Sequence, residues 1–339
     1  MSEQSYREPY REPLIREYTM FRCPVTGSQL EQKGDALVSV KGGHRYPLYD
    51  GIPDFATATV SDNVKRDIQS FWDAGPCGAQ HQDLQSVERG SPQFYAETEK
   101  KRYDLHTDFD KPFLKEVMGF EKVNGRRVLE IGCGIGVDAI QFARGGNDMY
   151  VVDLSPNSVR LTLGRFGLEK RSAHAAVVDA ENLPFAPETF DVVYSYGVLQ
   201  HTPDTEGTID HVYRVLKPGG KAMIMLYAKY SALALLQTFM HHGLRKGRFF
   251  KLWSFQRVLD EWTELGSKTG ELANPLSRAF TIAECKKMFH RFSTVQAEKH
   301  FLRPSHFAEA RHLLPLVPSS LRAKLPRLLG WNIVIKATK

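Results

Sequence analysis

Three glycines at alternate positions, Gly132, Gly134 and Gly136, follow the apolar run 128–131. Residues 137–144, which come next, have the apolar spacing of a helix. A strand, a tight turn and a helix in this order point backbone N–H groups at a ligand. Glycine is needed there because a side chain would hold the ligand away and because positive φ strains other residues. The loop is typical of a nucleotide-type cofactor site, although alone it is a weak signal.

Polar side chains follow three further apolar runs. Asp153 ends the run 149–152, about twenty residues past the first glycine, a separation typical of an acid that bonds ribose hydroxyls. Asp179 ends the run 175–178, and Ser195 and Tyr196 end the run beginning at residue 190. Since the carboxyl ends of parallel strands share one edge of a sheet, we expect these side chains to lie beside the glycine loop.

The elements that must position these groups alternate between strand and helix. After the run at 190–194 comes a helix-like segment ending at Leu216, the turn 217–220, and another apolar run at 221–227. Strands that alternate with helices predict an α/β fold, with a parallel sheet covered on both faces. Such sheets bind ligands at the carboxyl ends of their strands.

Residues 125–227 resemble a class I S-adenosylmethionine-dependent methyltransferase. The segments that carry the resemblance are 130–136 (EIGCGIG), 152–155 (VDLS), 179–185 (DAENLPF), 190–193 (FDVV) and 216–220 (LKPGG). The resemblance implies a transferase with a Rossmann-like, seven-stranded, doubly wound sheet and S-adenosylmethionine as cofactor. A nicotinamide dehydrogenase uses a similar loop, but Glu130 before the glycines and the segments 179–185 and 216–220 favour the methyltransferase.

The resemblance also implies which residues hold the cofactor: Glu130, Gly132, Gly134, Gly136, Asp153, Leu154, Asp179, Ala180 and Ser195. In this assignment the glycines shape the pocket for the methionine part, and Glu130 orients the loop or the amino group. Asp153 holds the ribose hydroxyls. Asp179 and the backbone of Ala180 flank the adenine and bind its exocyclic amine.

Composition and charge narrow the remaining choices. With 339 residues and 42% hydrophobic residues, the chain can build a core with additions. Its four scattered cysteines do not suggest disulfides and favour a reducing compartment. The segment 1–16 is polar, and no apolar run is long enough to span a bilayer, so we expect a cytoplasmic protein. The net charge of +6 permits an acidic partner without requiring one.

Ahead of the sheet, residues 1–20 are predicted to be a flexible terminus and 21–60 a separate β module. The segments 21–27 (FRCPVTG) and 46–55 (YPLYDGIPDF) resemble a small Trm112-like zinc ribbon. That ribbon has a second cysteine where this chain has Thr26, and Cys23 and His44 supply at most two of the four ligands of a structural zinc site. We therefore predict a degenerate ribbon without metal, which is structural or covers part of the active site.

Residues 61–124 are predicted to be a helical cap or linker before the methyltransferase domain at 125–339. Trp72 precedes a Pro-Cys-Gly turn that contains Cys77, and Tyr95 and Tyr103 lie on a predicted helix. In members of the resembled superfamily such a segment folds over the cofactor, which makes these four residues candidates to line the methionine and substrate pocket. Plain packing of the aromatic rings against the sheet is the alternative.

Methyl transfer from a sulfonium asks the protein to align a nucleophile and exclude water. A base is needed only if the nucleophile binds in its protonated form. We assign that base to His201, whose imidazole titrates near neutrality, and expect Tyr196 to bracket the methyl group. A His201 that only caps the next helix is the alternative. The segment 195–198 lacks the Asn/Asp-Pro-Pro-aromatic motif typical of base N-methylation, so nucleic acid is disfavoured.

Helical insertions are expected at about 229–290 and 303–330, and the final strands at 292–301 and 331–337. The basic residues Arg245, Lys246, Arg248 and Lys251 alternate with aromatic residues, and 303–327 is also basic. This pattern suits a helical lid with a solvated basic face, a peripheral membrane contact, or a nucleic-acid patch.

The sequence thus predicts an S-adenosylmethionine-dependent methyltransferase that acts by in-line displacement on a small-molecule nucleophile, a thiol or a hydroxyl. Two alternatives remain open. One is an enzyme for a lipid-like or quinone-like acceptor at a membrane surface. The other is a non-catalytic partner protein. Neither the acceptor nor the oligomeric state is indicated by the sequence.

Overall fold

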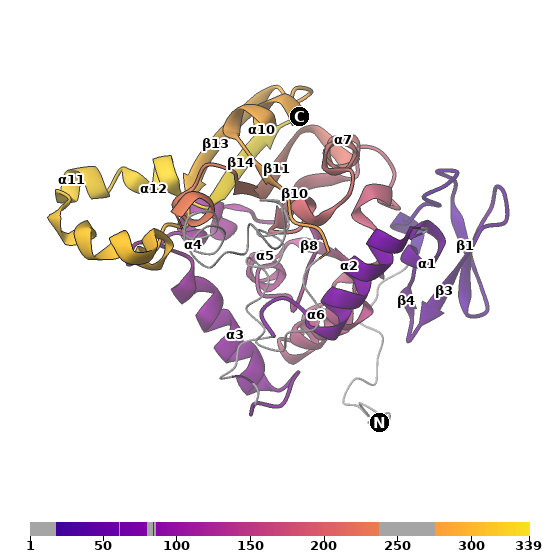
Figure 1. The fold of residues 1–339 in the computed structure, drawn as a ribbon. Coiled ribbons are helices and arrows are strands. Elements are labelled where there is room, and N and C mark those ends of the chain that lie inside the picture. The colour runs from indigo at the N-terminus through magenta and orange to yellow at the C-terminus, as the bar shows by residue number, and fades with distance from the viewer. Residues whose placement is uncertain (1–17, 61, 80–83, 85, 237–274) are drawn as a thin grey trace.

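A computed structural model describes residues 18–60, 62–79, 84, 86–236 and 275–339 (Figure 1). The predicted basic residues Arg245, Lys246, Arg248 and Lys251 lie outside the described residues. Among the helices described, none has the length and apolar character needed to cross a bilayer.

A large, mostly parallel sheet forms the centre of the molecule. Its strands are β7 (Arg127–Ile131), β8 (Asp148–Asp153), β9 (His174–Val177), β10 (Phe190–Tyr196), β11 (Leu216–Ala228), β12 (Ala279–Phe280), β13 (Thr294–His300) and β14 (Asn332–Thr338). The order is β13-β14-β11-β10-β7-β8-β9, with β12 paired to the end of β11. Only β14 runs antiparallel to its neighbours β11 and β13 in this part of the chain. The predicted Rossmann-like α/β fold is confirmed.

Strand order reverses between β7 and β10. From β7 the chain proceeds outward through β8 to β9, then returns to pair β10 on the other side of β7. Open α/β sheets bind ligands at this switch point, outside the carboxyl ends of the strands. The glycine loop follows β7 and therefore lies at that point.

Helices cover both faces of the sheet, which the nearly uninterrupted apolar strands require. The helices are α5 (Ala139–Arg144), α6 (Pro156–Leu168), α7 (Thr205–Val215) and α10 (Ile282–Met288). Ile140 and Phe166 of α5 and α6 belong to one hydrophobic cluster, while Val212 and Cys285 of α7 and α10 belong to the other. Helix α5 begins at residue 139 rather than at the expected 137, because residues 137 and 138 continue the turn.

The segment before β7 is helical. It contains α1 (Ala56–Thr59), α2 (Asn63–Ala74), α3 (Pro92–Leu105) and α4 (Leu114–Met118), and the short hairpin β5 (Thr107–Asp108) and β6 (Lys111–Pro112). The side chains of Asp62 and Ser91 cap α2 and α3 by accepting hydrogen bonds from the N–H groups of Lys65 and Phe94. These caps fix where the two helices begin beside the sheet.

A separate four-stranded antiparallel sheet precedes the helices: β1 (Leu30–Lys33), β2 (Ala36–Ser39), β3 (Arg45–Tyr49) and β4 (Ile52–Pro53). It lies to one side of the central sheet (Figure 1), and the N–H of Phe55 donates to the carbonyl of Val177 on β9. The Cys23 thiol is buried within 3.0 Å of the Tyr46 hydroxyl. The assignment of residues 21–60 to a degenerate ribbon stays a prediction.

The C-terminal addition is described from residue 275. It contains a 3₁₀ segment, η7 (Pro304–Leu316), and the short helices α11 (Ser319–Arg322) and α12 (Leu325–Leu329). Figure 1 shows this part projecting from the central sheet, on the side away from β1–β4. The remaining 3₁₀ segments are η1 (Tyr18–Met20), η3 (Phe120–Lys122), η4 (Ala180–Asn182) and η5 (Leu199–His201).

Candidate functional site

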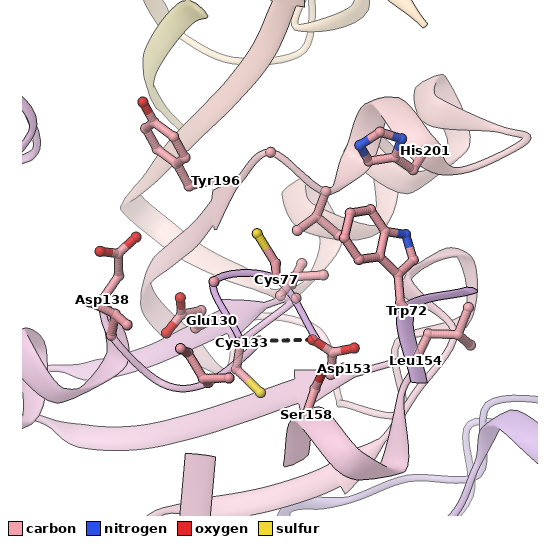
Figure 2. Close-up of a pocket in the computed structure, with 18 of the residues that line it drawn as sticks. Trp72, Cys77, Glu130, Cys133, Asp138, Asp153, Leu154, Ser158, Tyr196 and His201 are labelled. Atoms are coloured by element: carbon pink, nitrogen blue, oxygen red, sulfur yellow. Dashed lines mark hydrogen bonds between the residues drawn. The ribbon is translucent and has the colours of Figure 1, made fainter. Parts of the chain in front are cut away.

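A cavity of about 340 Å³ opens at the carboxyl ends of β7, β8, β9 and β10 (Figure 2). Its walls come from the sheet, from α2 and α3 of the helical segment, and from residues 301 and 303. No residue of the β module 21–60 belongs to the described wall. The predicted role of that module as a cover for the active site therefore has no support in the geometry.

The glycine loop forms the floor of this cavity. Gly132, Gly134 and Gly136 have φ angles of +77°, +54° and +72°. A Cβ added at Gly132 would stand 2.1 Å from a methyl group of Val198, and one at Gly136 would stand 3.0 Å from Thr162. Both the backbone conformation and the close approach of neighbouring elements therefore require glycine.

Asp153, at the end of β8, is held against this loop. Its carboxylate accepts hydrogen bonds from the N–H groups of Gly134 and Ser155, both at 2.9 Å, and Figure 2 marks the first as a dashed line. Burial raises the pKa of Asp153 to about 6, against the effect of these two donors. Leu154 lines the cavity next to it. The carboxylate thus lies in the cavity wall, where it is able to accept hydrogen bonds from a ligand.

Glu130, the second-last residue of β7, lies on the other side of the loop beside Asp138 (Figure 2). It is only 4% exposed, and its Oε2 has no hydrogen-bond partner within the described residues. Burial, and then the nearby Asp138 carboxylate, raise its pKa well above the usual range. A buried acceptor without a partner is costly, so this oxygen suits a ligand that brings a donor or a positive charge.

Asp179 and Ala180 line the cavity where β9 ends. The Asp179 carboxylate pairs with Lys65 of α2 at 2.7 Å, and Lys65 also contacts Glu181 at 2.5 Å. This ion pair ties the helical segment to the sheet at the edge of the cavity. Sequence reasoning missed Lys65, since no local pattern marks one lysine of an amphipathic helix as the partner of a carboxylate more than a hundred residues away.

Two residues expected to bind the cofactor lie outside the wall. Ser195 is fully buried, and its hydroxyl donates to the carbonyl of Ile131 at 2.9 Å, bracing β10 against β7. Gly136 faces Thr162 of α6. Both lie in the layer beneath the cavity, and their predicted part in cofactor binding stays a prediction.

The aromatic candidates divide in the same way. Trp72 and Cys77 line the cavity, and Figure 2 shows Cys77 close to the glycine loop and Trp72 beside His201. Tyr95 and Tyr103 do not line it, and their predicted place in the substrate pocket stays a prediction. The Tyr95 hydroxyl donates to the carbonyl of Leu161 at 2.6 Å, and the Tyr103 hydroxyl donates to the Asp138 carboxylate at 2.9 Å. These two rings pack α3 against the sheet, the alternative noted for them.

His201 lines the cavity beside Trp72, with ring centroids 5.6 Å apart. Its Nδ1 lies 2.7 Å from the carbonyl of Leu276, which only accepts, so this nitrogen is the donor. Its Nε2 lies 3.2 Å from the side-chain amide nitrogen of Gln200 and accepts from it. With both ring nitrogens engaged, the geometry does not support the prediction of His201 as a general base.

Tyr196 ends β10 at the opposite side of the cavity (Figure 2). Its hydroxyl accepts a hydrogen bond from the amide of Asn332 at 2.6 Å, and the guanidinium of Arg102 lies 4.5 Å from its ring centroid. Burial raises the pKa of Tyr196, so the phenol stays protonated. Its position beyond the glycine loop is compatible with the predicted contact to the methyl group, which stays a prediction.

Sequence reasoning missed the residues that close the cavity beyond Tyr196: Arg102, His106, Phe301 and Arg303. Thr98 and Arg102 of α3 and His106, which directly follows α3, recur every four residues and all line the cavity. That spacing, which places them on one helix face, was the signal available in the sequence. Residues 301 and 303 follow β13 and had no such signal, since their place in the wall depends on a contact distant in sequence.

The chain is similar in sequence to known methyltransferases. Residues 129–224 match a family model described as a methyltransferase domain. The chain is 32% identical over 182 residues to phosphoethanolamine N-methyltransferase 2 of Caenorhabditis elegans, covering 52% of this chain and 37% of that protein. It is 29% identical over 195 residues to sterol 24-C-methyltransferase of Pneumocystis carinii, covering 49% of each.

A bacterial relative matches at a similar level. The ubiquinone/menaquinone biosynthesis C-methyltransferase UbiE of Haemophilus ducreyi is 35% identical over 142 residues, covering 38% of this chain and 54% of that protein. The chain therefore spans between 37% and 54% of the length of these three relatives. The matched region contains the glycine loop, Asp153 and Asp179.

Proposed function

We propose that this chain, which carries a class I S-adenosylmethionine-dependent methyltransferase domain, is an enzyme that moves a methyl group to a small-molecule nucleophile. The predicted domain and its cofactor, S-adenosylmethionine, are confirmed by the family match and the named relatives. The acceptor and the reaction of the whole chain are the proposal. A hydroxyl or thiol acceptor is the form that we put forward.

One observation carries the proposal. Two carboxylates, Glu130 and Asp153, lie on opposite sides of the glycine loop in one cavity, and Glu130 has a buried oxygen without a partner among the described residues. S-adenosylmethionine presents an ammonium at one end and a ribose diol near its middle. Glu130 and Asp153 suit these two groups as acceptors, and the loop between them leaves room for the chain that joins the groups.

The bound cofactor supplies a methyl group that its sulfonium already activates. The work left to this chain is therefore to hold the acceptor in line and to exclude water. Cys77 lies against Gly134, Val198 closes against Gly132, and Trp72 lines the same cavity. Lys65 holds α2 against Asp179 at the edge of the cavity. These contacts reduce access of water from the side of the helical segment.

A transfer assay with methyl-labelled S-adenosylmethionine tests the proposal. Cell extract is separated into lipid, small polar and RNA pools, and each pool is incubated with the wild-type protein and with Asp153→Ala. Label in the small polar pool that depends on Asp153 supports the proposal. Label confined to the RNA pool contradicts it. Cofactor binding without transfer to any pool favours the non-catalytic partner protein.

A second candidate is an enzyme that takes a lipid-like acceptor at a membrane surface. Four leucines of the segment 311–330 are largely exposed: Leu313 60%, Leu316 79%, Leu321 49% and Leu328 60%. The same segment contains four Arg or Lys residues and no Asp or Glu. Exposed apolar side chains among basic ones suit the surface of an anionic bilayer.

Co-sedimentation with lipid vesicles tests the second candidate. Vesicles containing phosphatidylglycerol should bind the protein and vesicles of phosphatidylcholine alone should not, because each basic residue near an anionic surface contributes about 1 kcal/mol. Leu316→Ser should weaken binding, whereas Leu168→Ser, a leucine 43% exposed at the end of α6, should not. Equal binding of the two variants, or none by the wild-type protein, removes the candidate.

A further inference from the structure

The cavity continues past the glycine loop into a chamber lined by Arg102, Leu105, His106, Tyr196, Phe301 and Arg303. The rings of this chamber lie close together. The His106 imidazole is 5.2 Å from the Phe301 ring, stacked on it, and 5.4 Å from the Tyr196 ring, edge to face. These residues come from α3, β10 and the segment after β13, so the chamber is assembled by the whole fold.

The chamber has a guanidinium group, that of Arg303, which no carboxylate of the described residues pairs with. Arg102 forms an ion pair with Asp138, whose carboxylate also accepts from the hydroxyls of Tyr103 and Tyr194. Arg303, which is half-buried, forms no ion pair and no side-chain hydrogen bond with the described residues, while Asp138, the carboxylate nearest this end of the described wall apart from Glu130, is already paired with Arg102. A desolvated guanidinium without a partner favours a ligand that brings a negative charge.

The chamber also contains a free hydrogen-bond acceptor. Nδ1 of His106 lies 2.6 Å from the carbonyl of Arg102, and a carbonyl only accepts, so Nδ1 carries the proton. In the neutral ring Nε2 then has a lone pair, and it has no partner within the described residues. Burial, and then the Arg102 guanidinium, lower the pKa of His106 to about 3, so the ring is neutral near pH 7.

We propose that the methyl acceptor carries a carboxylate or phosphate group that pairs with Arg303, and a hydroxyl or thiol that donates a hydrogen bond to Nε2 of His106. This inference rests on the proposed function and names its class of acceptor. Phe301 and Tyr196 supply aromatic walls, which favour a planar apolar body between the two groups.

The transfer balances with these groups. A lone pair of the acceptor oxygen or sulfur forms the bond to the methyl carbon, while the carbon–sulfur bond breaks and its electron pair stays on the sulfur. The acceptor's proton passes to Nε2 of His106. One positive charge leaves the sulfur as one arrives on the imidazole, so the net charge of the chamber is unchanged. The bound anion beside Arg303 favours protonation of His106 at this stage.

Calorimetry on the complex with S-adenosylhomocysteine tests the inference without turnover. The probes are benzoate, phenyl phosphate and benzamide, the last a neutral molecule of the same shape as benzoate. We expect at least one anion to bind at least tenfold more tightly than benzamide, and the stronger anion to identify carboxylate or phosphate as the group recognised. Arg303→Gln should weaken that anion at least tenfold.

The matched control is Arg322→Gln, which removes an arginine from α11, outside this cavity, and should leave anion binding unchanged. Binding of S-adenosylhomocysteine is measured first on each variant, and its loss in the wild-type protein would count against the proposed function instead. The inference is overturned if benzamide binds as tightly as the anions, if neither anion binds, or if Arg303→Gln retains full anion binding.

Discussion

Two carboxylates beside one loop are held in different ways. Asp153 receives two backbone N–H groups, whereas Glu130 keeps a buried oxygen that no described residue satisfies. Burial raises the pKa of both. A ligand that donates hydrogen bonds to both carboxylates offsets the cost of their desolvation. These two residues therefore contribute to the free energy of ligand binding.

The raised pKa of Asp153 predicts a pH-dependent affinity. The carboxylate of the free protein takes up a proton as the pH falls through about 6, and a protonated group is a poor acceptor for ribose hydroxyls. The affinity for S-adenosylhomocysteine should therefore fall about tenfold between pH 7 and pH 5. Calorimetry at both pH values measures the change. Asp153→Asn should bind weakly at both, and the same pH dependence in that variant would assign the titration to another group.

Mutation of the two histidines of the cavity, His106 and His201, should have different effects on turnover and stability. Once the transfer assay has identified an acceptor, His106→Ala should lower turnover by roughly 10²-fold or more, the usual range for loss of a general base. His201→Ala removes hydrogen bonds to Leu276 and Gln200, so it should lower stability while turnover changes only a few-fold. Steady-state rates and thermal unfolding of both variants provide the comparison. The reverse pattern would return the base role to His201.

At the scale of elements, the sequence was sufficient for the strands and loops that form the cofactor end. Apolar runs that end in glycine, Asp153 or Asp179 are local patterns, and the parallel sheet brings their ends together. Helix faces were harder to assign. Tyr95 and Tyr103 turn toward the sheet because buried Arg165 stacks on Tyr95 and Asp138 accepts from Tyr103, contacts that no local pattern announces.

The part of the chamber formed by residues 301 and 303 could not be predicted for the same reason. Arg303 reaches the cavity because the chain after β13 packs against the hairpin β5–β6, where the N–H of Phe109 contacts the carbonyl of Leu302. These partners are nearly two hundred residues apart. Element order and type follow from local patterns, but the residues that select an acceptor come from contacts formed only in the folded chain.

The glycine turn gives a prediction at this scale. Gly132→Ala should destabilise the protein by roughly 1–3 kcal/mol, because its Cβ would overlap Val198 and its φ is positive. Val198→Ala in the same chain should recover part of the loss. Gly146→Ala is the control, since Gly146 has a φ of +72° but open space around its Cβ. Urea unfolding measures all four proteins, and equal losses for the two glycine variants would show that the contact with Val198 does not matter.

On the scale of the whole molecule, the cavity wall joins three separate stretches of chain: residues 65–106, 130–203 and 301–303. Three aromatic rings dock the β1–β4 sheet beside β9. The ring centroid of Phe21 lies 5.4 Å from that of Phe55 and 5.4 Å from that of Phe185. A ligand in the cavity would therefore contact the end of the central sheet to which the N-terminal β1–β4 sheet is attached.

Ligand binding should accordingly stabilise the molecule as a unit. At a ligand concentration of one hundred times Kd, S-adenosylhomocysteine should add about 2.7 kcal/mol to the free energy of unfolding. Thermal unfolding, followed by tryptophan fluorescence and by circular dichroism, should show one transition that moves upward by the same amount for both probes. A shift seen by fluorescence alone would mean that only the region around the tryptophans responds to the ligand.

The central claim is that Glu130, the glycine loop and Asp153 form an S-adenosylmethionine site. Titration calorimetry of S-adenosylhomocysteine against wild-type protein and Asp153→Ala at pH 7.5 tests it most directly. We expect binding at one site per chain, weakened in the variant by roughly 1–3 kcal/mol, or about fivefold to 150-fold. Absence of binding to the wild-type protein, or unchanged affinity in Asp153→Ala, would contradict it.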